Sequence, residues 1–185
     1  MHLRTEVTID RPREEVFRRL ADEMATTTPL ICPLTASVTL DRDETIGAGV
    51  TGRIIIQNLF TSATVVFEVT RYEKGERLSF EARYRTRSSQ IDYLFRDEGS
   101  GTTVVMVTDA PAVGPAWLQG WNERVLRRHE HLDAQRLKAL LEGRGSVPIL
   151  AVVRRNRGRS FALLVATGAI LALSWFLLRT WLAGA

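Results

Sequence analysis

The chain has 185 residues, of which 45% are hydrophobic and 25% are charged, and its formal net charge is +4 at pH 7. Residues 144–185 contain six arginines and no acidic residue, which leaves residues 1–143 with 19 basic and 21 acidic side chains. This distribution argues against nucleic acid as a partner, because a nucleic-acid-binding domain carries a basic face of its own, and it favours a membrane. The single cysteine, Cys32, excludes an internal disulfide and a cysteine-based zinc site.

The N-terminal segment, residues 3–10, alternates apolar and polar side chains. A half-buried strand is therefore expected there, and not a signal peptide, which needs an uninterrupted apolar run. Pro12 then opens a short helix over residues 12–21. Residues 24–33 are expected to be irregular, because they contain two helix-breaking prolines.

Strands are predicted over residues 37–40 and then, one after another, over residues 49–108. The side chains alternate between apolar and polar, and short turns at 74–76 and 97–101 connect consecutive strands, which indicates an antiparallel meander with one covered face. With the N-terminal strand, the sheet is expected to have about seven strands. Five aromatic side chains share the covered register: Phe67, Phe80, Tyr84, Tyr93 and Phe95.

A long helix is predicted over residues 116–142, ended by Gly143. At 100° per residue, its apolar side chains fall on one stripe. They are Leu118, Trp121, Val125, Leu132, Ala139 and Leu140. We expect this stripe to cover the apolar face of the sheet, which makes residues 1–143 one α+β domain.

No catalytic signature is found. The sequence has no phosphate-binding loop, dinucleotide fingerprint, zinc-protease motif or nucleophile elbow, so no catalytic residue and no cofactor is predicted. His129 and His131 are two positions apart on a helix and point to different sides, which argues against a metal site. His129 falls within the apolar stripe. It is interpreted either as a polar handle or acid/base group at a cavity wall, or as an interface histidine paired with Asp133.

Residues 161–178 form an uncharged run of 18 residues, ten of which are Leu, Ile, Val or Phe. As a helix the run would reach about 27 Å, close to the hydrocarbon thickness of a bilayer. We therefore expect a transmembrane helix over 161–182, preceded by a basic juxtamembrane linker over 144–160. The alternative interpretation is a buried core helix.

The charges that flank this run predict its orientation. Four arginines precede it and only Arg179 follows it, so the positive-inside rule places the N-terminal domain in the cytoplasm and makes the chain a tail-anchored, single-pass protein of the cytoplasmic membrane. Tryptophans near its far end suit the opposite interface. The residues expected to meet the membrane are Arg154, Arg155, Arg157, Arg159, Trp175 and Trp181.

Four segments of residues 3–143 resemble the START-like superfamily, also called SRPBCC. They are TEVTIDRPREEVFRRLAD (5–22), VTRYEKGERLSFEA (69–82), YLFRDEGSGTTVV (93–105) and HLDAQRLKALLEG (131–143). The superfamily includes polyketide cyclases and aromatases, plant hormone and allergen binders, lipid-transfer domains and coenzyme-Q-binding proteins. The resemblance implies a helix-grip fold, in which a curved antiparallel sheet wraps a long C-terminal helix and leaves a cavity between them.

In that fold, the five inward aromatic residues of the sheet are expected to contact a ligand, together with Trp121, Val125 and His129 of the helix, and Trp117 at the cavity mouth. The predicted function is binding, transfer or presentation of a hydrophobic small molecule, such as a lipid, isoprenoid or polyketide-like compound, at the membrane. One alternative is a cyclase or aromatase, with His129 or Tyr84 as general acid/base. Another is an accessory subunit of a membrane complex.

Overall fold

The computed structural model describes residues 1–42, 45–57, 62–112 and 116–144. The chain divides into two compact units, residues 1–146 and 147–185, and every described residue belongs to the first. The predicted linker and transmembrane helix, including all six residues expected to meet the membrane, lie outside the described residues. Within the described part of the chain, no helix is long and apolar enough to cross a bilayer.

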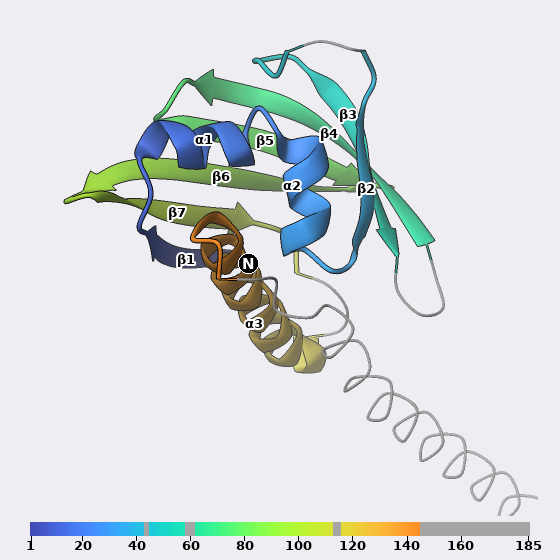
Figure 1. Cartoon of the computed structure of the whole chain (residues 1–185). Helices are drawn as coiled ribbons and strands as arrows, with labels where there is room; N and C mark the ends of the chain where they lie inside the picture. Colours follow the sequence, from blue (N-terminus) through green and yellow to red (C-terminus); the bar gives the residue numbers. More distant parts are fainter. Residues whose placement is uncertain (43–44, 58–61, 113–115, 145–185) are drawn as a thin grey trace, which may run out of the picture. The chain divides into compact units, whose positions relative to one another are not determined.

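One seven-stranded antiparallel sheet forms the body of the first unit, as predicted (Figure 1). Its spatial order is β1-β7-β6-β5-β4-β3-β2, so the chain runs as a meander from β2 to β7 and the N-terminal strand pairs with the last one. The strands are β1 (His2–Ile9), β2 (Thr35–Leu40), β3 (Thr51–Gln57), β4 (Ser62–Glu73), β5 (Arg77–Tyr84), β6 (Arg87–Glu98) and β7 (Gly101–Asp109).

The period-2 pattern of the sequence decides which face of β1 is covered. Every second residue from Leu3 to Ile9 is buried, and the intervening residues are exposed. Val7 lies opposite Val104 of β7, so the two strands contribute to one continuous apolar face. A shift of one residue in this pairing would expose the whole set, which is why the register is well specified.

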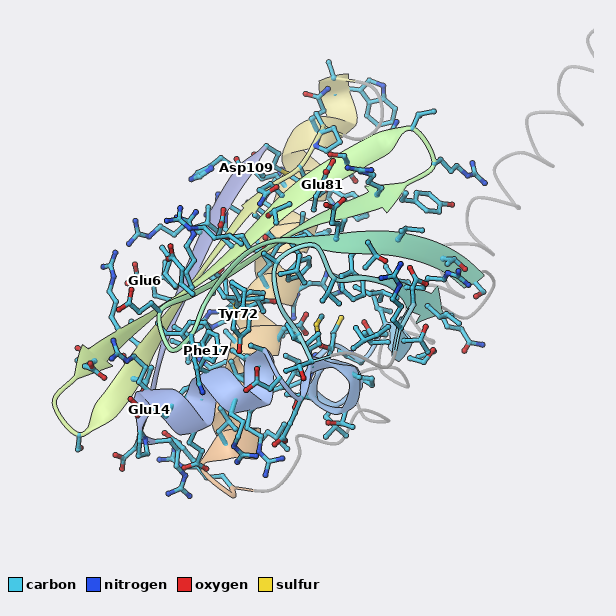
Figure 2. All side chains as sticks on the ribbon, turned by 90° about the horizontal axis from the view of Figure 1, so that it is seen from above. Glu6, Glu14, Phe17, Tyr72, Glu81 and Asp109 are labelled. Atoms are coloured by element: carbon cyan, nitrogen blue, oxygen red, sulfur yellow. The ribbon has the colours of Figure 1, made fainter. Side chains whose placement is uncertain are left out.

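Two short helices, α1 (Arg13–Leu20) and α2 (Met24–Ile31), follow β1. Phe17 of α1 meets Tyr72 of β4 and Phe95 of β6 edge to face, with ring centroids 5.4 and 5.0 Å apart. Figure 2 labels Phe17 and Tyr72 next to each other, between α1 and the sheet. These contacts fasten α1 to the sheet, since edge-to-face pairs add to the gain from burial.

The expectation of irregular structure at residues 24–33 is wrong, because α2 occupies most of this segment. Pro29 lies inside α2 and removes one backbone donor. The helix nevertheless buries Met24, Thr27 and Ile31 against its neighbours. In an eight-residue helix most of the stability comes from such packing, so tertiary burial outweighs the local preference of proline.

The long helix α3 (Ala116–Leu141) matches its predicted bounds to within one residue, but its buried face differs from the prediction. Its most buried apolar residues are Ala134, Leu137 and Leu141, whereas Trp121 is 58% exposed. At 100° per residue, Trp121 lies about 160° around the helix from Leu137, so both cannot face the sheet. The C-terminal half of α3 packs beside β1 and α2 and sets the rotation of the whole helix.

Candidate functional site

A groove of about 440 Å³ runs along the N-terminal half of α3, against Met1, which precedes β1, and the segment after β7. Val125 and Leu126 give it an apolar wall, and amide, carboxylate and imidazole groups complete the lining. Its lining residues are Met1, Ala112, Gln119, Asn122, Glu123, Val125, Leu126 and His129. Mostly apolar walls with a few polar groups are typical of small-molecule sites.

His129 is half-buried at one end of this groove. Its Nδ1 lies 2.9 Å from the carbonyl oxygen of Val125, one helical turn earlier. Because a carbonyl oxygen only accepts, Nδ1 carries the proton in this contact, and the neutral ring keeps Nε2 as an acceptor. His129 thus hydrogen-bonds to the backbone and not to Asp133, the partner in one of the two interpretations, and a positive charge on its ring would lower the pKa of the Asp133 carboxyl.

One turn beyond His129, α3 places polar side chains against α2 and the sheet. Asp133 accepts a hydrogen bond from Nη1 of Arg136 at 2.9 Å, and it also interacts with the thiol of Cys32, which follows α2. Glu130 accepts a hydrogen bond from Oγ1 of Thr5 at 3.3 Å. The residues Cys32, Tyr93, Glu130, Asp133 and Arg136, which interact through charge or hydrogen bonds, are called the interior polar cluster below.

In the interior polar cluster, the pKa values of Asp133, Cys32 and Tyr93 are shifted toward their neutral forms. Burial raises the pKa of the Asp133 carboxyl, although the nearby Arg136 opposes this shift. Burial, with the charge of Asp133, also raises the pKa of the Cys32 thiol. The pKa of Tyr93 is raised by burial and by the same acidic neighbours.

Arg136 is the buried cation of the cluster, with only 5% of its surface exposed. Its Nη1 donates to Asp133 and, at 3.4 Å, to the carbonyl oxygen of Ile31. Its Nε is buried and has no hydrogen-bond partner among the residues that the structure describes. A buried guanidinium with a spare donor can accommodate a carbonyl, hydroxyl or carboxylate oxygen.

Of the aromatic residues predicted to contact a ligand, Phe67, Phe80 and Phe95 are buried in the core, and Tyr93 packs against it. Phe80 is the centre of a row: its ring lies 6.1 Å from that of Phe67 and 6.0 Å from that of Tyr93. The inward placement of these four side chains is confirmed. Their contact with a ligand stays a prediction.

Three aromatic residues of the predicted site are placed differently. Tyr84 is 39% exposed at the end of β5, where the guanidinium of Arg85 lies 5.3 Å from its ring centroid. Trp117 and Trp121 are 79% and 58% exposed and do not line the groove. The predicted inward placement of Trp121 is therefore wrong, and the physical reason is the rotation of α3 described above.

The interior polar cluster was not predicted from the sequence, apart from Asp133 as a partner of His129. One signal was present: Leu126, Glu130, Asp133 and Leu137 follow one another at spacings of four, three and four residues, which places them on one helical face. Because two of these four residues are carboxylates, the face is not apolar, and a search for an apolar stripe does not find it. In the described ranges, no group of three or more histidine, cysteine or carboxylate residues could hold a metal ion.

A sheet that packs against a long C-terminal helix, with a groove beside that helix, defines a helix-grip domain. The chain belongs to the polyketide cyclase/dehydrase and lipid transport family, whose model matches residues 1–142. This confirms the superfamily that the sequence motifs indicate. A search of curated proteins found no match.

Solved structures share the fold at low sequence identity. TTHA0849 from Thermus thermophilus is 18% identical, with a TM-score of 0.64 over 79% of this chain and 100% of its own. The Zhui aromatase/cyclase from Streptomyces sp. R1128 is 17% identical, with a TM-score of 0.62 over 78% of this chain and 94% of its own. Ara h 8.0201 is 10% identical, with a TM-score of 0.62 over 76% and 97%. At these identities the likeness shows the fold alone.

Proposed function

We propose that residues 1–143 bind a hydrophobic small molecule in the groove beside α3, and that the C-terminal segment anchors this domain at the cytoplasmic face of a membrane. The observation that carries the proposal is the groove itself, about 440 Å³ in volume, with Val125 and Leu126 on its wall and His129 at one end. A lipid, isoprenoid or polyketide-like compound suits such a site, since its apolar body leaves water while one polar group finds a partner.

The interior polar cluster, part of which follows His129 by one turn of α3, supports the same proposal. The buried Nε of Arg136 has no hydrogen-bond partner among the residues that the structure describes, so it can donate to an oxygen atom of a ligand. A ligand that carries a hydroxyl or carbonyl at one end would satisfy this donor, whereas a pure hydrocarbon would leave it unpaired at a cost of about 1–3 kcal/mol.

Membrane anchoring is proposed from the sequence of residues 144–185, which lies outside the described residues. The uncharged run 161–178 and the four arginines before it are the signals. Anchoring would confine the domain to the surface where hydrophobic molecules partition, so that the ligand need not cross water. High-salt washing of membranes tests this: the full chain should stay in the pellet, and a chain without 161–185 should be released.

Ligand binding is tested by purifying the full chain in mild detergent and identifying co-purified small molecules by mass spectrometry after solvent extraction. Leu126→Trp should fill the groove and remove the bound molecule. Gln135→Trp, on an exposed position of the same helix, is the matched control and should keep it. The absence of any bound molecule in both wild type and control would contradict the binding proposal.

A cyclase activity is the second candidate. It is favoured by the position of Asp133 one helical turn after His129, where the two side chains are close enough to interact. Cyclisation followed by loss of water needs a group that accepts a proton and one that donates it, and an imidazole and a carboxyl of raised pKa are suited to these two roles. The Zhui neighbour is described as an aromatase/cyclase. Conversion of a polyketide-like substrate by wild type, lost in Asp133→Asn, would make this the preferred function.

Stoichiometric co-purification of another membrane protein without any ligand would instead favour the accessory-subunit alternative.

A further inference from the structure

The N-terminal half of α3 carries an exposed stripe that the groove does not use. Trp117 and Trp121 are the two most exposed large apolar residues among those that the structure describes, at 79% and 58%. Arg124 and Arg128 are also exposed. At 100° per residue, the four side chains lie within about 60° of one another on the helix surface. We call these four residues the tryptophan–arginine stripe.

The charge beside this stripe is strongly positive. A shallow depression between α3 and β1 is lined by seven residues: Arg4, Thr5, Glu6, Arg124, Arg127, Arg128 and His131. Four of them are arginines, and only one is acidic. Arg4 pairs with Glu6, and Arg127 pairs with Glu123 at 2.9 Å, which leaves the arginines of the stripe as the main excess charge. This face therefore complements a surface of negative charge.

The combination of residue types selects one kind of occupant. Tryptophan prefers the boundary between water and hydrocarbon, where its ring is half desolvated and its indole N–H finds a partner. Arginine pairs with phosphate through a planar set of donors while its stem lies on apolar surface. A helix with both on one exposed face matches an anionic phospholipid surface, in which headgroup phosphates lie just above the acyl chains.

From these observations we infer that α3 docks through the tryptophan–arginine stripe on the headgroup layer of an anionic membrane. Val125, a lining residue of the groove, lies only about 40° around the helix from Trp121. Docking therefore brings the rim of the groove to the bilayer, where a hydrophobic molecule can pass between lipid and protein without crossing bulk water. The surface contact stands on the stripe alone, whereas its role in ligand exchange rests on the proposed function.

The test uses the full chain reconstituted in lipid nanodiscs, with Trp175→Phe and Trp181→Phe so that only Trp117 and Trp121 report. Lipids with a nitroxide near the headgroup quench tryptophans that lie at the interface. We expect strong quenching in discs of phosphatidylcholine with about 30% phosphatidylglycerol, and weak quenching in phosphatidylcholine alone. Salt at about 0.5 M should reduce it, because screening weakens phosphate contacts.

Arg124→Gln with Arg128→Gln should lower the docking constant about fivefold per arginine, or roughly 30-fold together. Arg18→Gln with Arg19→Gln removes two arginines from α1 and is the matched control, which should dock as wild type. Quenching that is absent, or that is indifferent to lipid charge and to both arginines, would overturn the inference. A blue shift without lipid quenching would also overturn it, and would assign the stripe to another segment of this chain or, where the shift depends on protein concentration, to a second copy.

Failure of this inference and failure of the proposed function are distinguishable. Co-purified ligand that depends on Leu126, without quenching of the stripe, would leave binding intact and remove docking. Quenching of the stripe without any co-purified ligand would support docking and contradict ligand binding.

Discussion

The thiol of Cys32 and the carboxyl of Asp133 lie against each other inside the fold, although about a hundred residues separate them in the sequence. The two groups interact through a hydrogen bond and through charge, and burial raises the pKa of both. The pair joins the end of α2 to the C-terminal half of α3, one helical turn beyond His129 of the groove. Its protonation state should therefore affect the stability of the domain.

Asp133 should make the stability of the domain depend on pH. Its pKa in the folded chain is raised above the ordinary value of about 4, so protonation favours the folded state. The stabilising effect is complete below about pH 4 and is lost as the pH rises through the raised pKa. The asparagine of Asp133→Asn stays neutral and can still accept a hydrogen bond from Arg136. As the pH rises through the raised pKa of Asp133, the free energy of unfolding of Asp133→Asn should therefore increase relative to that of wild type. Urea unfolding of the full chain in detergent, followed by circular dichroism, measures it.

Asp22→Asn is a suitable control for this experiment, because Asp22 is exposed and accepts a hydrogen bond from Tyr72 at the surface. Parallel pH profiles for wild type and Asp133→Asn would contradict the assignment of the titration to Asp133.

Cys32 should react slowly with alkylating reagents at neutral pH. Its raised pKa keeps the thiol protonated, and the thiolate is the reactive form. Asp133→Asn removes a negative charge that raises this pKa, so the rate profile should move to lower pH. Iodoacetamide labelling followed by mass spectrometry reads a single site, because the chain has one cysteine. Labelling of the folded chain as fast as that of the urea-unfolded chain would show that the thiol is not protected.

Gly52 is expected to tolerate no side chain. A methyl group there would lie 2.5 Å from the carbonyl oxygen of Thr39 and 2.6 Å from Cζ of Phe67, which is itself fully buried. Gly52→Ala should therefore destabilise the domain by about 1–3 kcal/mol, as overpacking does in other cores. Gly120→Ala meets nothing within 4 Å and should stabilise α3 by about 0.5–1 kcal/mol. Equal effects of the two substitutions on urea unfolding would refute this view of the β3–β4 contact.

Trp121→Ala should behave as a surface substitution, with a change below about 0.5 kcal/mol in the free energy of unfolding. A tryptophan facing the sheet would instead cost about 3–5 kcal/mol. Phe17→Ala supplies the comparison, because Phe17 is 2% exposed and contacts two aromatic rings. A large loss of unfolding free energy for Trp121→Ala would show that Trp121 faces the sheet, as the apolar stripe predicted.

His129→Gln should leave the affinity for a hydrophobic ligand within about tenfold of wild type. Glutamine retains a polar group of similar reach but does not titrate near neutral pH. The apolar wall at Val125 and Leu126, which supplies most of the expected binding energy, is unchanged. Displacement of a fluorescent lipid measures the affinity. Product formed from a polyketide-like substrate by wild type and lost in His129→Gln, with the fold intact, would support the cyclase alternative instead.

The sheet could be predicted from the sequence because its signals are local. Alternation with a period of two and glycine turns both follow from a few neighbouring residues and from the need to bury one face. The pairing of β1 with β7 joins distant segments and is seen only in the tertiary structure. The inward placement of Phe67, Phe80 and Phe95 follows from the same alternation. The family was also recognisable, since its motifs lie in these strands and turns.

The rotation of α3 and the composition of the candidate site were decided by tertiary structure. The sequence of α3 offers two faces, one with Trp121 and Val125 and one with Leu126, Asp133 and Leu137, and local periodicity favours the more apolar one. Packing of Ala134 and Leu137 against β1 and α2 selects the other, because the burial of the C-terminal half fixes a rigid helix along its whole length. This choice exposes the tryptophans and brings Asp133 to Cys32, a contact between distant segments that no local pattern encodes.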